Sequence, residues 1–360
     1  MEAVEQNSRT LFRISKLRRL SVTFGLSLLA VFTLSLGTGA VDIPVSQLHA
    51  VVIKYLGFEP SAAFSPQQEA VLLHIRLPRL LLAVIVGSGL GISGAVLQGL
   101  FRNPLVEPAL IGVSSGSALA AVIVIVFSGF FSGAIKEILG VYLLPVLAFC
   151  GGLFAALTAY RLSKIDGCSN IALLILIGVA INAMAAALIG LTIYFASESA
   201  LRDFTFWSMG DLAGATWQKI GISSLFVLVP SAYLLKYHRE LNALALGEPE
   251  AAYLGIPVEK VKRTMIAAAA LIVGASVAIT GIISFIGLVI PHMVRTAFGP
   301  DHKLVLTGSM LGGAALLILA DLAARTLVSP AELPIGIVTA LVGAPFFTYL
   351  LVKNKKKRAV

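Results

Sequence analysis

One stretch of the sequence matches the glycine pattern that binds the phosphates of dinucleotides. Residues 89–94 read G-L-G-I-S-G, which satisfies G-x-G-x-x-G. That pattern binds a dinucleotide only where a strand precedes it and a helix begins at it, facing the phosphates. Here the stretch lies within an apolar run, and Gly87 and Gly91 have the four-residue spacing that lets two membrane helices approach closely. We therefore predict that these glycines serve helix packing.

The sequence lacks the residues that ATP binding, metal binding or nucleophilic catalysis would need. No G-K-[ST] triplet occurs, so the chain has no Walker A loop for ATP. The five histidines have no metal-ligand spacing with carboxylates in one span, and the serines have no nearby His/Asp set. Cys150 and Cys168 stand near helix ends, where thiols are most often packing residues. We predict no catalytic residue, no metal site and no cofactor, and therefore a protein that is not an enzyme.

Arginines gather at the ends of two apolar runs. Arg76 and Arg79 flank Pro78 just before one run. Arg325 ends another run, one turn after Asp321. Two interpretations stay open: an Asp–Arg pair four residues apart could neutralise a charge near the membrane interface. Alternatively, arginines at one rim would attract acidic residues of a docking protein.

The composition indicates the elements that must position these residues. Of the 360 residues 58% are hydrophobic and only 12% are charged, whereas soluble domains are about a quarter charged. One membrane-spanning helix needs about 20 predominantly apolar residues, so the apolar residues suffice for about ten spans. This composition excludes a soluble enzyme, a disordered protein and a disulfide scaffold.

We predict an all-α, polytopic membrane protein with about ten transmembrane helices, and a single transmembrane domain over 1–360. The predicted spans are 20–40, 77–98, 108–128, 140–161, 171–196, 218–236, 264–281, 285–297, 304–325 and 335–352.

The positions of the cations predict the orientation. If the N-terminus is cytoplasmic, 20 of the 27 basic residues lie inside, including those of a tail over 1–19 and a basic tail over 353–360. The other seven are Lys54, Arg76, Arg79, Lys136, Arg202, Lys219 and Arg325. This bias follows the positive-inside rule. The net charge of +9 therefore reports topology, and we predict no nucleic-acid partner.

An internal repeat accompanies this topology. Residues 84–104 match residues 271–291 at an offset of 187, with six identities, and a proline ends both stretches. The second and seventh spans run in opposite directions, so the repeat is predicted to be inverted, relating helices 2–5 to helices 7–10. Inverted repeats are common in transporters, although a purely structural duplication stays open.

A long polar connection, residues 241–263, joins the sixth and seventh spans on the inner side. Residues 250–254 can form a short helix that Gly255 ends, and Pro257 can begin a second helical turn. Two short helices on the inner face would form a knob for a partner protein. An ordinary interfacial loop is the alternative.

Several long stretches together resemble the permease family of ATP-driven importers for iron-siderophores, haem and cobalamin. They are IRLPRLLLAVIVGSGLGISGAVLQGLFRNPLVEPALIGVSSG (75–116), LALGEPEAAYLGIP (244–257), GIISFIGLVIPHMVR (281–295), DHKLVLTGSMLGGAALLILADLAAR (301–325) and AELPIGIVTALVGAPFF (331–347). The resemblance covers nearly everything after the first span.

The resemblance implies a homodimer of ten-helix subunits in the bacterial inner membrane, surrounded by lipid, with a pathway at the dimer axis. It implies two cytoplasmic ATPase subunits that bind the coupling residues Gly247, Glu248, Pro249, Glu250, Leu254, Gly255 and Pro257. It also implies a periplasmic substrate-binding protein whose acidic residues meet Arg76, Arg79 and Arg325. Transport would proceed by alternating access driven by these partners.

The resemblance leaves the pathway and the cargo less defined. It places the inner gate at the start of the fifth span, where the sequence Cys168-Ser169-Asn170 differs from the family pattern. Candidate pathway residues are Asn170, Asn182 and Tyr194. Residues 181–217 resemble the haem-importing branch most, so haem is the expected cargo, with an Fe(III)-siderophore or cobalamin as alternatives. An ion-coupled secondary carrier is a weaker alternative, because Glu107, Asp321 and Arg325 lie near helix ends rather than at mid-depth.

Overall fold

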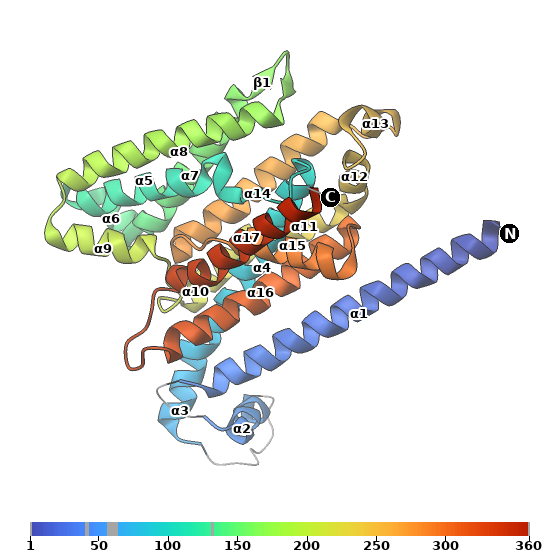
Figure 1. The fold of residues 1–360 in the computed structure, drawn as a ribbon. Helices are drawn as coiled ribbons and strands as arrows, with labels where there is room; N and C mark the ends of the chain where they lie inside the picture. The colour runs from blue at the N-terminus through green and yellow to red at the C-terminus, as the bar shows by residue number, and fades with distance from the viewer. Residues whose placement is uncertain (1, 40–42, 56–63, 131–132, 359–360) are drawn as a thin grey trace.

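The computed structural model describes residues 2–39, 43–55, 64–130 and 133–358, which are helical almost throughout (Figure 1). The first half contains α1 (Glu2–Gly37), α2 (Val45–Tyr55), α3 (Pro66–Val71), α4 (Leu77–Leu100), α5 (Val113–Val126), α6 (Gly133–Leu139), α7 (Leu143–Leu162), β1 (Lys164–Ile165), β2 (Cys168–Ser169) and α8 (Ile171–Tyr194). The second half contains α9 (Glu198–Ser208), α10 (Trp217–Ser223), α11 (Val229–Leu234), α12 (His238–Leu244), α13 (Glu248–Tyr253), α14 (Val258–Thr280), α15 (Ile286–Phe298), α16 (His302–Thr326) and α17 (Ile335–Arg358).

Ten apolar helical segments follow one another in the described residues, in the predicted order. Seven are long and apolar enough to cross a membrane: Ser15–Gly37, Pro66–Leu100, Glu137–Leu162, Ile171–Tyr194, Trp217–Leu244, Val258–Thr280 and His302–Thr326. Three are shorter: Val113–Val126, Ile286–Phe298 and Ile335–Tyr349. The predicted all-α, multi-pass architecture is confirmed, with ten as an approximate number of spans.

Several helix limits differ from the prediction. α1 begins at Glu2, so most of the predicted tail 1–19 is helical. α17 continues to Arg358, so the tail 353–360 is helical up to that residue, and residues 359–360 lie outside the described residues. α5 begins only at Val113, because Gly112 before it adopts a left-handed φ of 86°. The sixth span continues to Leu244 through a π turn, Ser224–Leu228, next to Pro230, which has no N–H to donate.

The repeat is visible in the elements, although the residue alignment that suggested it is wrong. Gly94 lies inside α4, whereas its predicted counterpart Gly281 follows the end of α14. Pro291 lies inside α15 rather than at a helix break. Each half instead contains a long helix, then a residue of left-handed φ, then a short helix. In the first half these are α4, Gly112 and α5, and in the second half they are α14, Phe285 and α15. The packing is reciprocal as well: α4 packs on α16, and α14 packs on α7.

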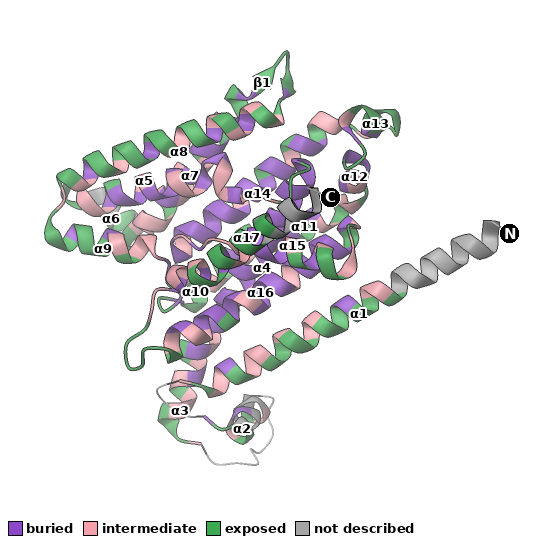
Figure 2. Cartoon of the chain, in the orientation of Figure 1, coloured by how far each residue is buried: buried purple, intermediate pink, exposed green. Residues whose placement is uncertain are grey.

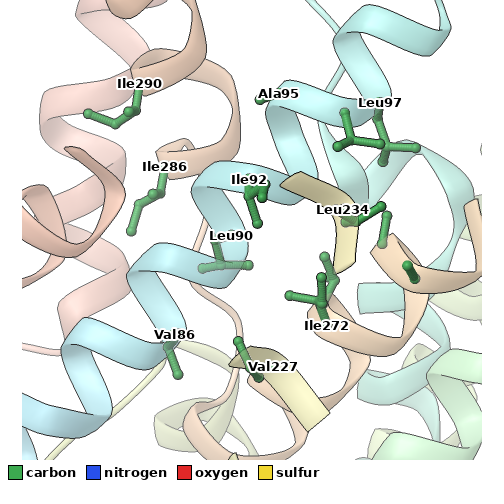
Figure 3. Close-up of a cluster of buried hydrophobic side chains, with 14 of the residues drawn as sticks. Val86, Leu90, Ile92, Ala95, Leu97, Val227, Leu234, Ile272, Ile286 and Ile290 are labelled. Atoms are coloured by element: carbon green, nitrogen blue, oxygen red, sulfur yellow. The ribbon is translucent and has the colours of Figure 1, made fainter. Parts of the chain in front are cut away.

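The centre of the bundle is α4, which is buried along nearly its whole length (Figure 2). Figure 3 shows its apolar side chains, from Val86 to Leu97, meeting residues of the second half such as Val227, Ile272 and Ile286. A helix that is apolar on all sides is stable only where other helices or lipid surround it. The core therefore forms between the two halves, and α1 and α8 at its periphery stay largely exposed.

Glycines set the distance between α4 and α16. A Cβ on Gly87 would meet the backbone of Gly313, and one on Gly91 would meet the carbonyl of Ser309. The prediction that these glycines serve helix packing is confirmed.

The bundle has two distinct ends (Figure 1). The β1–β2 hairpin and α13 lie at one end, and the amino-terminal end of α1 lies toward the same side. α2, α3 and α9 lie at the opposite end. Each end contains one of the clusters of functional residues that the sequence predicts.

Candidate functional site

Residues 241–263 fold into the end of α12, the short helix α13 and the beginning of α14. α13 begins at Glu248, somewhat earlier than predicted, and Gly255 ends it as predicted, with φ 81°. The N–H of Gly255 donates to Ala252 O (2.9 Å), and that of Ile256 donates to Ala251 O (3.1 Å). This pair of bonds is a Schellman motif, which requires a left-handed residue at its end. The turn after Pro257 opens the long helix α14 rather than a second short helix.

α13 projects from the bundle and carries exposed apolar side chains at its carboxyl end (Figure 1). Tyr253 is 92% exposed, Leu254 after it is exposed as well, and so is Leu246, which precedes α13. Ala251, on the opposite face of the helix, is fully buried. Exposed apolar side chains gathered on a projection are the kind of surface that a partner protein can cover. Residues 241–263, the predicted coupling segment, thus contain a projecting helix that is fixed by one face.

An ion pair holds this helix to the bundle. Glu248 Oε2 lies 2.9 Å from Lys262 Nζ, and the Lys262 side chain is only 3% exposed. A buried ammonium is stable only with acceptors around it, because it has lost its water. Glu248 therefore fixes the first turn of α13 to the second turn of α14.

At the opposite end, Asp321 joins two arginines of different helices. Arg79 Nε donates to Asp321 Oδ1 (2.7 Å), and Arg325 Nε donates to Asp321 Oδ2 (3.1 Å). Arg79 also donates to Glu332 Oε2 (2.8 Å). Asp321 is fully buried. The predicted pairing of Asp321 with Arg325 is present, and it includes Arg79, which lies 242 positions before Asp321.

Arg76 and Arg325 bind the carboxyl end of α1. Arg76 Nη1 donates to the carbonyls of Leu36 (2.5 Å) and Gly37 (3.0 Å), and Arg325 donates to the Thr38 carbonyl (3.1 Å). The last carbonyls of a helix have no partner within the helix, and cations there complement its dipole. Arg76 and Arg79 are buried, and the Arg325 side chain is 8% exposed. Binding of a docking protein by these arginines therefore stays a prediction.

The three predicted pathway residues are not brought together. Asn170 caps α8, since its Oδ1 accepts from Leu173 N (3.0 Å). Asn182 lies in the middle of α8, and its Nδ2 donates to the carbonyl of Ala109, which precedes α5 (3.2 Å). Tyr194 is the last residue of α8 and is 82% exposed. At about 1.5 Å per residue, Asn182 and Tyr194 lie about 18 Å apart along the axis.

The described residues contain no group of three His, Cys, Asp or Glu side chains that could hold a metal ion. Cys150 and Cys168 are free and exposed rather than packed. One carboxylate is unusual: Glu107 Oε1 accepts from Phe285 N (2.8 Å), at the left-handed residue before α15. Burial raises the pKa of the Glu107 carboxyl, and the bond from Phe285 opposes that rise.

Sequence reasoning missed Lys262, Glu259 and the β1–β2 hairpin. The hairpin does have a local signal, because Asp166-Gly167 is a dipeptide that favours a two-residue turn, and both residues have positive φ. Lys262 has no such signal. Its partner Ser169 lies 93 positions earlier, so only the packing of α14 against the hairpin brings the two residues together.

Comparison with known proteins agrees with this architecture. The model of the FecCD transport family matches residues 27–353. The chain is 45% identical to the hemin transport system permease protein HmuU of Yersinia pestis over 287 residues, which are 80% of this chain and 84% of the relative. It is 41% identical to the cobalamin import system permease protein BtuC of Halobacterium salinarum over 286 residues, 79% and 74% of the two chains.

A solved structure is also similar. An inward-facing conformation assigned to the metal-chelate type of ABC transporters matches with a TM-score of 0.80 and 35% identity, over 93% of this chain and 99% of the other. In ABC importers of this family, ATP is hydrolysed by a separate ATPase subunit and not by the permease. The family match, the shared helical architecture and the solved neighbour agree: the chain belongs to the FecCD transport family and is a permease of an ABC importer.

Proposed function

We propose that the chain is the permease of a haem importer. The observation that carries this proposal is the 45% identity to a hemin permease over most of both chains. A permease of this kind supplies no reaction chemistry. It offers two conformations, and its partners shift the balance between them.

The coupling segment is the proposed contact with the ATPase. Its exposed Tyr253 and Leu254 offer apolar area, and Glu248 ties the same helix to α14. We propose that two ATPase subunits bind the α13 knobs of a homodimer at the cytoplasmic face of the inner membrane. Closure of the ATPase dimer on ATP would then move both knobs together.

The opposite end is the proposed contact with a periplasmic binding protein. The arginines there bind the chain's own oxygens, so docking on Arg76 and Arg325 would require acidic side chains to replace carbonyls at the end of α1 as acceptors. Docking on Arg79 would require them to replace Asp321 or Glu332. α8, with Asn170, Asn182 and Tyr194, is the proposed wall of the pathway. Large apolar side chains along it, such as Leu176 and Met184, are exposed in the single chain and suit a flat, apolar cargo.

An uptake assay tests the proposal. The chain, its co-purifying ATPase and its binding protein are reconstituted in proteoliposomes, and haem, cobalamin and a ferric siderophore are offered with and without ATP. We expect ATP-dependent uptake of haem and none without the ATPase. Uptake of haem driven by an ion gradient alone would contradict an ABC importer.

A cobalamin or iron-chelate permease is the second candidate. It is favoured by the 41% identity to a cobalamin permease and by the solved metal-chelate neighbour. In the same assay, ATP-dependent uptake of cobalamin or siderophore with no uptake of haem would support this candidate and exclude the first.

A further inference from the structure

A buried polar cluster connects the coupling segment to the beginning of α8. Its centre is Lys262, which is 2% exposed. Lys262 Nζ donates to the backbone carbonyl of Ser169 (2.6 Å) and to Glu248 Oε2 (2.9 Å). One ammonium group thus binds both α13 and the strand β2. An ammonium has three donors in a compact head, so it can bind two elements at once.

Glu259, one turn before Lys262, binds the same serine from its other side. Glu259 Oε2 accepts from Ser169 N (3.0 Å) and Ser169 Oγ (2.9 Å), while its Oε1 accepts from Tyr160 OH (3.1 Å). The N–H, the hydroxyl and the carbonyl of Ser169 are therefore all bound by two residues of α14. β2 cannot shift relative to α14 without breaking these bonds.

The hairpin in turn leads directly into α8. β1 and β2 pair in antiparallel register, with Lys164 opposite Ser169, across the turn at Asp166-Gly167. Asn170, the next residue, donates its N–H to Ser163 O (3.0 Å) and caps α8 through its side chain. A displacement of Ser169 therefore moves the cap and the first turn of α8.

We propose that Lys262 is a positioning residue that transmits a displacement of α13 to the hairpin 164–169 and to the beginning of α8. The path runs from Glu248 to Lys262 by an ion pair and from Lys262 to Ser169 by a hydrogen bond, and it reaches Asn170 through the chain itself, since Asn170 follows Ser169. The inference rests on the proposed function, because it assumes that an ATPase moves α13. It adds to the proposed function one residue, Lys262, which transmits the movement of α13 to α8, the proposed wall of the pathway.

A purely structural role for Lys262 is the competing explanation, and it predicts a different result. If Lys262 only stabilised the inner end, its replacement would lower stability, but the hairpin would still respond to nucleotide. If it transmits movement, its replacement would leave the ATPase bound and active while the hairpin no longer responds.

The chain provides its own probe for the test. Cys168 lies in β2, is exposed and is a free thiol. In a Cys150→Ser background, a nitroxide on Cys168 reports hairpin mobility in the full complex with the co-purifying ATPase, in nanodiscs. Spectra are compared without nucleotide and with ATP and vanadate.

We expect a nucleotide-dependent spectral change with the natural Lys262, its loss in Lys262→Met and its recovery in Lys262→Arg, which keeps a cationic donor. Lys260→Met is the matched control, because Lys260 lies on the same helix but is exposed, and it should keep the change. If Lys262→Met does not fold, Glu248→Ala tests the other end of the ion pair, with ATPase binding measured alongside and Lys260→Met again as the control.

The outcomes separate the two proposals. A full spectral change in Lys262→Met, with the ATPase bound and hydrolysing ATP, would overturn the relay and leave the importer intact. A natural complex that transports haem while the Cys168 label never responds would do the same. If no ATPase binds the natural chain, the proposed function fails, and the relay falls with it.

Discussion

Asp321 is a buried carboxylate between two guanidinium groups, Arg79 and Arg325. Replacing it by Asn would remove the counter-charge of Arg325 and leave Arg79 paired with Glu332 alone. Removal of one member of a buried ion pair costs about 3–5 kcal/mol. We expect Asp321→Asn to lower the thermal unfolding midpoint in detergent strongly. The measurement is fluorescence-detected unfolding of the purified permease.

Glu332 is the control at the same site. It also pairs with Arg79, but its side chain is 46% exposed, and exposed pairs contribute about 0–1 kcal/mol. Glu332→Gln should therefore shift the midpoint little. Equal shifts for the two variants would mean that burial of Asp321 does not decide the stability of this end.

At the scale of elements, α4 and α16 approach closely because they present glycines to each other. We expect Gly91→Ala to destabilise the fold, since its Cβ would meet the Ser309 carbonyl and overpacking costs about 1–3 kcal/mol. Gly190→Ala in α8 is the matched change, because open space surrounds that position. There alanine should be neutral or stabilising by up to about 1 kcal/mol, as helix propensity predicts. The yield of folded protein in size-exclusion chromatography and its unfolding midpoint report both effects.

The end of α13 is the second element whose geometry depends on a glycine. Gly255 has φ 81° and open space around it, so Gly255→Ala adds backbone strain of about 1–2 kcal/mol and no clash. The strain should fray α13 and reduce haem uptake per ATP hydrolysed by the reconstituted complex. Gly140→Ala is the control, with φ 48°, open space and a position outside the coupling segment. An unchanged ratio of haem uptake to ATP hydrolysis in Gly255→Ala would mean that transport does not depend on the geometry of α13.

These elements also show how far sequence reasoning reaches. Apolar runs and cation positions predict the spans, because lipid imposes length and sidedness on each helix separately. The glycine end of α13 was also predictable, because its signal is local. The partners of Lys262 and Arg79 were not, because helix contacts across 93 and 242 positions set them. The repeat was predicted with the wrong register, since its halves share backbone geometry rather than residues.

At the scale of the whole molecule, helices of each half pack on helices of the other half. α4 of the first half packs on α16 of the second, and α14 packs on α7. The core therefore forms only when both halves are present. The end that carries α13 is connected through hydrogen bonds to the beginning of α8, whereas at the opposite end arginines bind the end of α1. A movement of α13 can thus reach α8 while the opposite end keeps its own contacts.

The orientation of the whole chain can be tested along one helix. The hairpin with Cys168 precedes α8, and Glu198 in α9 follows its other end, so the two positions lie on opposite sides of the membrane if α8 spans it. The charge bias places the hairpin inside. In a Cys150→Ser background, we expect a membrane-impermeant maleimide to label Cys168 in inside-out vesicles and not in spheroplasts. In a chain that also lacks Cys168, Glu198→Cys should show the reverse pattern, because its position is exposed on the other side. Labelling of Cys168 from the outside would invert the topology and place α13 where no cytoplasmic ATPase could reach it.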